Sequence, residues 1–263
     1  MRFSIITISF NSEKTIERTI KSVLAQTCKD YEYIIVDGAS KDGTLDIVKM
    51  YEPLFEGRMK WKSEPDTGIY NAMNKGIARA TGKIIGIVNS DDWLEPNALE
   101  ILEREIEKEP ANLQKILTGE VLFHYEDGST QHYPTSYERY EYHAKRYNMG
   151  LNHPATFVPK SIYNKYGVFD ERFKLYADSD FIVRCYENGV GVCFVHVVLS
   201  NMADGGASNT FSRASLNDSL LKVRKHAKTK AERIRLEARC YVMWVLKSLT
   251  PKWYLKMYRH QHN

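Results

Sequence analysis

Residues 83–93, KIIGIVNSDDW, run from an apolar stretch straight into two adjacent carboxylates, Asp91 and Asp92. Like charges side by side repel, and one of them tends to stay protonated unless a cation lies beside the pair. Proteins hold a hard divalent cation with one or two carboxylates, and the phosphates of a ligand complete its coordination shell. We therefore interpret this stretch as a buried strand that ends at a site for Mn²⁺ or Mg²⁺.

The sequence before this strand alternates between strand and helix patterns. The helix patterns repeat apolar residues at helical spacing, and Asn11 or Ser12 is placed to cap the first of them. Alternation of this kind predicts right-handed crossovers and a largely parallel sheet. Strand patterns cover residues 3–9, 31–37, 59–64 and 83–89, and helix patterns cover residues 11–27, 45–54 and 68–82.

Polar side chains gather where these strands end. Asp37 closes the second strand, Asp66 follows the third, and Asp91 and Asp92 follow the fourth. Any one Asp is equally well explained as a cap of the next helix. In parallel sheets, however, ligands bind beyond the carboxyl ends of the strands. Acids after three strands that end at one edge therefore favour a ligand site.

The second part of the chain is less regular. Residues 116–123 and 191–199 have strand patterns, and His196 is expected to be a core residue of the second. Residues 177–189 predict a helix whose acids, Asp178 and Asp180, stand in its first turn, where the helix dipole favours negative charge.

Composition narrows the class of protein. The four cysteines form no CxxC pair, which argues against a zinc site or a disulfide framework. The sequence contains no GxGxxG motif after its first strand and no GxxxxGK[ST] motif, so a dinucleotide-binding or P-loop enzyme is not expected. The segment MRFSIITISF does not have the pattern of a signal peptide.

Two long segments resemble a known family. SIITISFNSEKTIERTIKSVLAQTCKDYEYIIVDGASKDGT and EPDTGIYNAMNKGIARATGKIIGIVNSDDW are similar to the nucleotide-binding half of family-2 inverting glycosyltransferases with a GT-A fold. Weaker similarity continues through NHPATF and YADSDFIVR. The resemblance implies an α/β protein with a Rossmann-like mixed sheet flanked by helices. It divides the chain into a nucleotide-sugar-binding half (1–105), an acceptor-binding and catalytic half (106–211) and a basic amphipathic helical tail (212–263).

The resemblance also implies roles at the donor site. Asp37 would bind the uracil of a UDP-sugar, and Asp66 would lie against the nucleoside. Asp91 would approach the ribose or the sugar, and Asp92, with Asp91 beside it, would bind the metal through the diphosphate. The remaining donor-binding candidates are Thr7, Phe10, Asn11, Lys75 and His153.

An inverting transfer needs a general base that deprotonates the acceptor hydroxyl. The family places this carboxylate at the start of a helix in its second half, and YADSDF is the corresponding segment here. Asp178 aligns best with the base, and Asp180 is the second candidate. Both acids could instead serve only as helix N-terminal charges.

The expected acceptor is a glycan, or a glycan linked to a lipid. From Leu216 to Asn263 the chain has 12 Lys/Arg and 3 Asp/Glu, so this segment carries +9 and the rest carries −5. Aromatic and basic residues in the last 25 positions suit an anionic membrane surface, although a helical hairpin packed on the body explains them equally well. Nucleic acid is not expected, because no nucleic-acid-binding motif accompanies the charge. The protein is expected in the cytoplasm, on the inner face of the membrane if the tail binds there.

Two other functions fit parts of the sequence. A nucleotidyltransferase has a similar Rossmann-like half but usually begins with a glycine-rich basic loop, which TISFNSEKT is not. A non-catalytic nucleotide- or glycan-binding subunit would be expected to lack the carboxylates of the metal site, which are present here.

Overall fold

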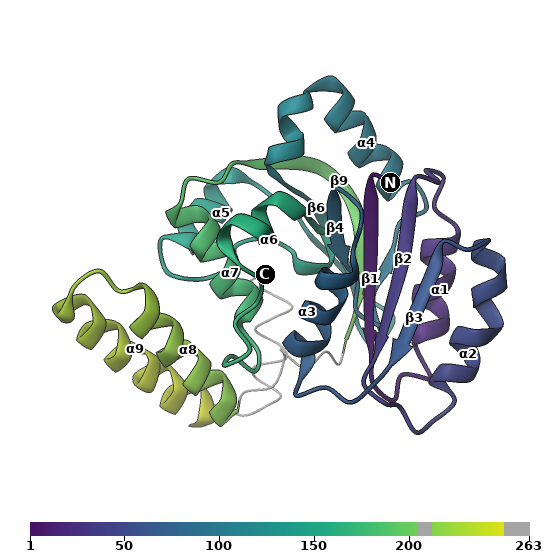
Figure 1. Cartoon of the computed structure of the whole chain (residues 1–263). Helices are drawn as coiled ribbons and strands as arrows, with labels where there is room; N and C mark the ends of the chain where they lie inside the picture. Colours follow the sequence, from purple (N-terminus) through teal and green to yellow (C-terminus); the bar gives the residue numbers. More distant parts are fainter. Residues whose placement is uncertain (205–211, 250–263) are drawn as a thin grey trace.

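A computed structural model describes residues 1–204 and 212–249 of the chain. Its central feature is one mixed sheet in the order β3-β2-β1-β4-β8-β6-β9-β5, with β7 paired to β6 (Figure 1). The strands are β1 (Phe3–Ser9), β2 (Tyr31–Asp37), β3 (Met59–Ser63), β4 (Ile84–Ile87), β5 (Trp93–Leu94), β6 (Ile116–His124), β7 (Thr130–Tyr133), β8 (Thr156–Pro159) and β9 (Val192–Ala203).

Helices cover both faces of this sheet, and a helical hairpin follows them. The covering helices are α1 (Ile16–Leu24), α2 (Thr44–Tyr51), α3 (Ile69–Arg79), α4 (Ala98–Lys108), α5 (Tyr137–Ala144), α6 (Lys160–Tyr166) and α7 (Ala177–Glu187), and the hairpin consists of α8 (Arg213–His226) and α9 (Lys230–Leu249). Short 3-10 turns cover Glu52–Phe55, Pro110–Gln114 and His153–Ala155.

The parallel half of the sheet confirms the predicted alternation. β1 pairs in parallel with β2 and β4, and β2 pairs in parallel with β3. The register sets Ser9 opposite Asp37, and Asp37 opposite Ser63. Three strand ends therefore lie in one row at the carboxyl edge. β8 continues the sheet antiparallel to β4 and to β6.

Alternation along the strands divides the core into two layers. Phe3 and Ile5 of β1 pack in the layer that contains α1, α2 and α4, whereas Ile6 and Ile8 pack in the layer that contains α3, α5, α6 and α7. Successive side chains of a strand point to opposite faces, so a strand buried on both sides is apolar throughout. This explains the uninterrupted apolar patterns in the sequence.

The first helix begins later than the sequence predicts. Neither Asn11 nor Ser12 caps it, because α1 starts at Ile16 with Thr15 at the N-cap position. Asn11 adopts a left-handed backbone with φ of 50°, and the Ser12 backbone N–H donates to Thr44 Oγ1 at 2.8 Å. Residues 10–15 thus form a loop at the carboxyl edge of the sheet.

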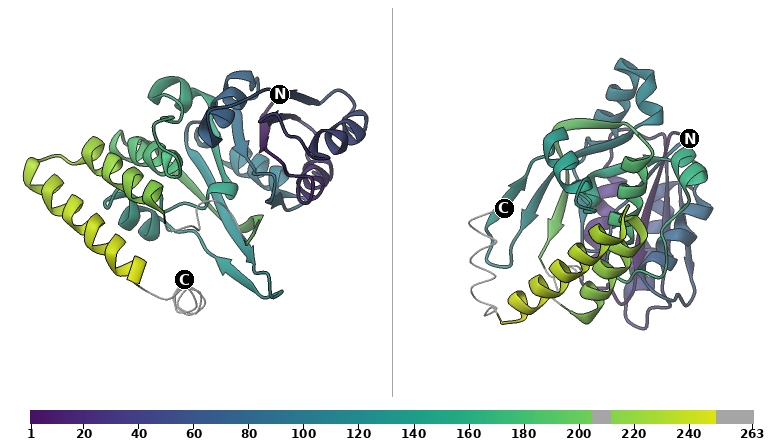
Figure 2. Two further views of the ribbon diagram at one scale, coloured as in Figure 1. Left: turned by 90° about the horizontal axis from the view of Figure 1, so that it is seen from below. Right: turned by 90° about the vertical axis from the view of Figure 1, so that its left-hand side faces the viewer.

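The basic tail forms a helical hairpin in its described part. Figures 1 and 2 show α8 and α9 side by side, with α8 nearer to α7 and the sheet. The segment 250–263, which contributed to the membrane expectation, lies outside the described residues. Within the described ranges, every helix is too short or too polar to cross a membrane.

Glu32 links neighbouring segments at the edge where the parallel strands begin, opposite their carboxyl ends. Its buried carboxylate accepts hydrogen bonds from the Ser4 and Thr81 hydroxyls and from Lys60 Nζ at 3.1 Å. Burial alone would raise the pKa of Glu32, but the hydrogen bonds from Ser4 and Thr81 outweigh burial and lower the pKa to about 2. The ionised form is therefore favoured in the folded state.

We expect Glu32→Gln to lower the free energy of unfolding at pH 7 by about 2 kcal/mol, because hydrogen bonds to a charged acceptor are lost. A folded-state pKa below its unfolded value adds stability above about pH 4.5, which is lost as the pH falls toward about 2. Urea unfolding at several pH values measures both effects. Glu56→Gln on the surface is the control, with a change of about 0.5 kcal/mol or less. Equal acid sensitivity of wild type and Glu32→Gln would contradict the assignment.

Candidate active site

The carboxylate of Asp37 holds three loops together at the carboxyl edge. Its side chain is only 1% exposed. Ser9 Oγ donates to Oδ1 at 3.0 Å, and the Ser40 backbone N–H and Ser63 Oγ donate to Oδ2 at 2.9 and 2.6 Å. Both oxygens are therefore engaged by the protein. This arrangement departs from the predicted contact between Asp37 and a uracil ring, because the carboxylate is buried and already satisfied.

Phe10, Gly38 and Asp66 lie close together beside Asp37. A Cβ at Gly38 would lie 2.6 Å from Asp66 Oδ2 and 3.3 Å from Phe10 Cδ2, so a larger residue would push these side chains away. The Phe10 side chain is 64% exposed. An exposed ring and a carboxylate beside bare backbone could hold a planar base between them. The sequence predicted Phe10 and Asp66 here but missed Gly38, whose importance depends on the contact with Asp66.

Three other residues predicted to bind the sugar donor are engaged by protein partners instead. Thr7 is fully buried and accepts a hydrogen bond from the Tyr33 hydroxyl at 3.0 Å, so it belongs to the core and cannot contact a ligand. Asn11 Oδ1 accepts from the Lys41 backbone N–H at 2.9 Å and shapes the loop. Lys75 Nζ donates to the Pro65 carbonyl at 2.7 Å and lies 3.5 Å from Glu64, which ties it to the β3–α3 loop.

The acidic pair lies in the turn after β4. Asp92 is 2% exposed, and burial together with the charge of Asp91 raises the pKa of Asp92 to about 8. Burial also raises the pKa of Asp91. Asn89 Nδ2 donates to Asp92 Oδ2 at 3.1 Å, while the buried Asn89 Oδ1 finds no hydrogen-bond partner in the described part of the chain. A carboxyl group that stays protonated near neutral pH and an unsatisfied oxygen acceptor therefore lie side by side, and a cation would favour ionisation of both acids.

Residues of α1 fix the backbone of this turn. Arg18 donates to the Asp91 carbonyl at 2.7 Å, and its guanidinium lies 3.7 Å from the centre of the Trp93 ring. Thr19 Oγ1 donates to the Asp92 carbonyl at 2.6 Å. Sequence reasoning missed Arg18 and Thr19, because nothing in an amphipathic helix indicates which polar residue faces a loop more than seventy positions away.

The residues present fit a hard divalent cation bound together with a ligand. Within residues 1–204 and 212–249, no three His, Cys, Asp or Glu side chains converge as a complete metal site. A cation that binds with a diphosphate needs only one or two protein carboxylates. Asp91 and Asp92 offer these, with oxygen donors of the kind that Mg²⁺ and Mn²⁺ prefer.

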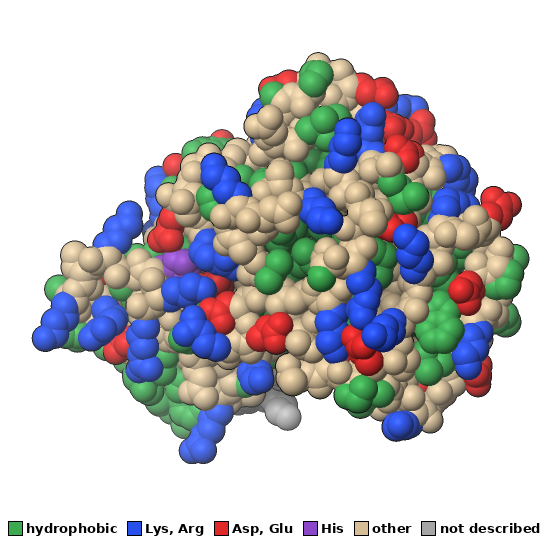
Figure 3. Space-filling view, in the orientation of Figure 1, with side chains coloured by type: hydrophobic (Ala, Val, Ile, Leu, Met, Phe, Trp, Pro, Cys, Tyr) green, Lys and Arg blue, Asp and Glu red, His purple; other side chains and the backbone are tan. Residues whose placement is uncertain are grey.

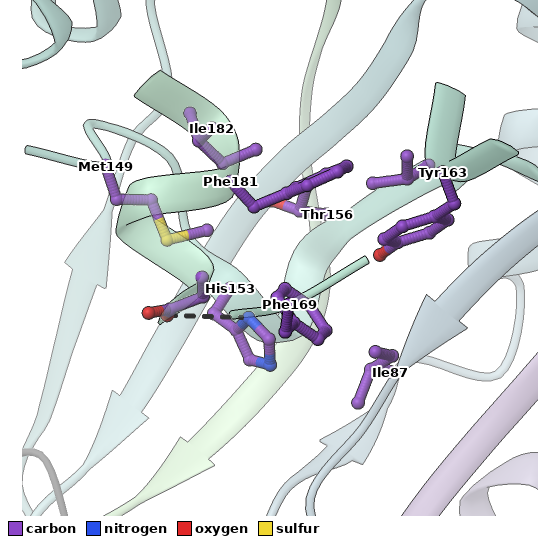
Figure 4. Close-up of a pocket in the computed structure, with 10 residues that line it drawn as sticks. Ile87, Met149, His153, Thr156, Tyr163, Phe169, Phe181 and Ile182 are labelled. Atoms are coloured by element: carbon purple, nitrogen blue, oxygen red, sulfur yellow. Dashed lines mark ion pairs between the residues drawn. The ribbon is translucent and has the colours of Figure 1, made fainter. Parts of the chain in front are cut away.

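Asp178 is the second residue of α7 and remains 22% exposed. The Tyr70 hydroxyl donates to Asp178 Oδ1 at 3.1 Å, and the Ser179 backbone N–H donates to the same oxygen at 2.8 Å. His153 Nδ1 lies 3.7 Å from Oδ2, as the dashed line in Figure 4 marks. Asp178 is thus oriented by partners but still reachable, as a general base must be.

His153 and Asp178 line a small pocket of about 20 Å³, which is room for about one water molecule. Figure 4 shows the His153 ring beside Phe169 in this pocket, with Ile87 from the end of β4 at one side. Burial lowers the pKa of His153, and the charge of Asp178 opposes this only in part. The buried Nε2 of His153 finds no hydrogen-bond partner among the described residues, so it can meet a bound molecule.

Asp180 has a different environment. It is fully buried, and its oxygens lie 3.0 Å from Arg184 Nε, 2.8 Å from Lys225 Nζ and 2.9 Å from His226 Nε2. A carboxylate enclosed by these partners has no route to an acceptor hydroxyl, which corrects its candidacy as the base. His196 is also corrected: its side chain is 67% exposed, because it faces solvent from the irregular centre of β9.

One face of α8 holds the start of α7. The buried Asp218 accepts hydrogen bonds from the backbone N–H groups of Lys174, Leu175 and Tyr176 at 2.6 to 3.1 Å. One turn later, Lys222 Nζ donates to Ser179 Oγ at 2.9 Å, and burial lowers the pKa of Lys222 to about 8. The first helix of the tail is therefore part of the site's framework.

Comparison with known proteins gives a family match. The sequence profile described as Glycosyl transferase family 2 matches residues 4–167. A PGL/p-HBAD biosynthesis glycosyltransferase of Mycobacterium bovis is 32% identical over 215 residues, which cover 79% of each chain.

Solved structures share the architecture. S. aureus TarS 1-349 in complex with UDP-GlcNAc aligns over 92% of this chain and 72% of its own, with a TM-score of 0.66 and 18% identity. This chain spans 43% of a longer TarS chain. The mannosyltransferase PcManGT from Pyrobaculum calidifontis, in complex with GDP-Man and Mn²⁺, aligns over 91% of this chain and 69% of its own, with a TM-score of 0.63 and 15% identity. These likenesses show that the mixed sheet is the predicted GT-A fold.

We expect Asp180→Asn to lower the free energy of unfolding by about 3 kcal/mol or more, because it leaves buried cations without a counter-charge. Thermal unfolding at neutral pH measures the loss. Asp46→Asn, at an exposed pair with Lys49, is the control and should change stability by less than about 0.5 kcal/mol. Full stability with lost turnover would instead place Asp180 in the chemistry.

Proposed function

The chain belongs to Glycosyl transferase family 2, and we propose that it catalyses metal-dependent inverting transfer of a hexose or N-acetylhexosamine from a UDP-sugar to a hydroxyl of a glycan. The observation that carries this proposal is the acidic pair at the carboxyl edge of the parallel strands, the half-buried Asp91 and the buried Asp92, with raised pKa values and an unsatisfied Asn89 oxygen beside it. A cation here would favour the ionised form of both acids, and a nucleotide diphosphate would supply its remaining ligands.

The nucleoside would lie against Phe10, Gly38 and Asp66. Phe10 offers an exposed ring for stacking, and Gly38 lets the base approach the backbone. Asp66 would accept a hydrogen bond from the base or the ribose. Asp37 acts indirectly in this proposal, because it fixes the loops after β1, β2 and β3 through the hydroxyls of Ser9, Ser40 and Ser63.

Asp92 and Asp91 would hold Mn²⁺ or Mg²⁺. When bound, such an ion neutralises negative charge on the departing diphosphate. The chain's own contribution is to fix the turn that carries the two acids, through hydrogen bonds from Arg18 and Thr19 to their carbonyl groups.

Asp178 would be the general base. Its carboxylate removes the proton of the acceptor hydroxyl while that oxygen forms a bond to the anomeric carbon, and the bond from that carbon to UDP breaks on the opposite side. Tyr70 donates a hydrogen bond to Asp178 Oδ1 and so orients the carboxylate. His153, at 3.7 Å from Oδ2, would contact the acceptor or the donor through its free Nε2.

In this proposal residues 1–105 form the donor half, residues 106–211 the acceptor half, and α8 a support for the acceptor half. The acceptor is a glycan of the surface-polysaccharide kind, linked to a lipid. The protein would then work at the inner face of the membrane, with the α8–α9 hairpin nearest to the lipid.

We expect Asp178→Asn to lower kcat by about 10²- to 10⁴-fold, because the general base is removed. Affinity for UDP should stay within about twofold, since Phe10, Asp66 and the acidic pair are untouched. Steady-state transfer assays and calorimetric titration with UDP measure the two quantities. Unchanged turnover would exclude Asp178 as the base.

We expect Asp92→Asn to weaken Mn²⁺-dependent binding of UDP by about tenfold or more, because a charged oxygen ligand is lost. Chelation of the metal should abolish transfer by the wild type. Titration across UDP- and GDP-sugars, with Mn²⁺ or with EDTA, measures this and identifies the donor. Asp30→Asn on the surface is the control. UDP binding that is insensitive both to EDTA and to Asp92→Asn would contradict the metal site.

A further inference from the structure

A large groove lies where the α8–α9 hairpin meets the body. Its volume is about 1040 Å³, which is large for a small-molecule site. The body contributes residues 145–149 and the segment 175–179 at the start of α7, and the hairpin contributes one side of α8 and one side of α9. The groove therefore begins at the proposed base and runs away from the sheet between the two helices.

Asp178 lies at the boundary between the groove and the small pocket that faces the donor side. It lines both, as does Met149. The small pocket also contacts Ile87 at the end of β4, just before the acidic turn. A molecule in the groove can thus bring a hydroxyl to Asp178.

The groove is positively charged. Five basic side chains and two acidic ones line it. One acid is Asp178, and the other, Glu232, already accepts a hydrogen bond from the Tyr147 hydroxyl at 3.1 Å. Arg235 and Arg239, one turn apart on α9, are exposed along its wall, and the buried Lys222 stands at its inner end beside Ser179. This pattern is complementary to an anionic group.

The groove is also apolar over much of its length. Its walls include Tyr147, Met149, Leu216, Leu236, Met243 and Trp244. On the adjoining outer side of α9, Tyr241, Val242, Val245 and Leu249 are 47–76% exposed. Figure 3 shows Lys and Arg side chains over the hairpin and hydrophobic side chains at its lower end. A soluble anionic sugar would not need such walls, whereas an amphiphile would fill them.

We infer that this groove binds the acceptor through its carrier, an amphiphile with an apolar chain and a phosphate group to which the acceptor glycan is attached. Arg235 and Arg239 face the phosphate, the apolar walls take the chain, and the glycan reaches Asp178. The inference rests on the proposed function for the place of the sugar. Binding of the carrier itself depends only on the groove.

Dodecyl phosphate is a suitable probe, used below its micelle concentration with saturating UDP and Mn²⁺ so that the donor site is filled. We expect saturable calorimetric binding that is at least about tenfold tighter than binding of inorganic phosphate or of the uncharged dodecyl maltoside. The double variant Arg235→Glu/Arg239→Glu should weaken it by about tenfold or more, and Leu236→Gln should also weaken it. Lys230→Glu/Arg233→Glu changes the net charge equally at α9 positions outside the groove, and should retain affinity within about twofold.

If the two double variants weaken dodecyl phosphate binding equally, binding reflects general charge attraction and the proposed groove site is refuted. Binding to phosphatidylglycerol vesicles without saturable binding of dodecyl phosphate would also overturn it, and would make α9 a contact for a membrane surface. Metal-dependent UDP binding with no dodecyl phosphate binding would refute this inference and leave the proposed transfer intact. If the protein binds dodecyl phosphate but no nucleotide sugar, the groove is supported and the proposed transfer is refuted.

Discussion

Buried carboxylates must be matched by donors or by cations, and this constraint sorts the acids of the chain into two groups. Asp37, Asp180 and Asp218 are buried and fully engaged by protein partners, so they fasten loops and helices. Asp92 is buried and Asp91 half-buried, both with few partners, and burial raises the pKa of both. The first group builds the framework of the site, and the second is the proposed metal site.

The framework extends into the tail through a single helix face. Asp218, Lys222, Lys225 and His226 recur on α8 at helical spacing, and each contacts α7 or the loop before it. The position of Asp178 therefore depends on residues some forty positions later in the chain. The same helix forms one wall of the groove, so support for the proposed base and the proposed path of the acceptor come from one element.

Sequence patterns predicted much of the fold because strands buried on both faces are apolar, whereas loops lie in solvent and are polar. The parallel strands, the acids at their ends and the acidic start of α7 could all be read in this way. The errors have a shared cause. The resemblance placed Thr7 beside the base, yet its hydroxyl accepts a hydrogen bond from Tyr33 inside the core. His196 looked buried because its neighbours are apolar, yet the irregular centre of β9 turns it to solvent.

The sequence by itself determined the parallel strands and their acidic ends, because periodicity and local motifs are properties of neighbouring residues. Its similarity to family-2 glycosyltransferases implied the GT-A fold. Only the tertiary structure separated Asp178 from Asp180. Two positions along a helix turn a side chain by about 200°, so one acid faces the pocket and the other faces α8. The contacts of Gly38 with Phe10 and Asp66 and the groove beside the hairpin likewise exist only where distant segments meet, and no local pattern encodes them.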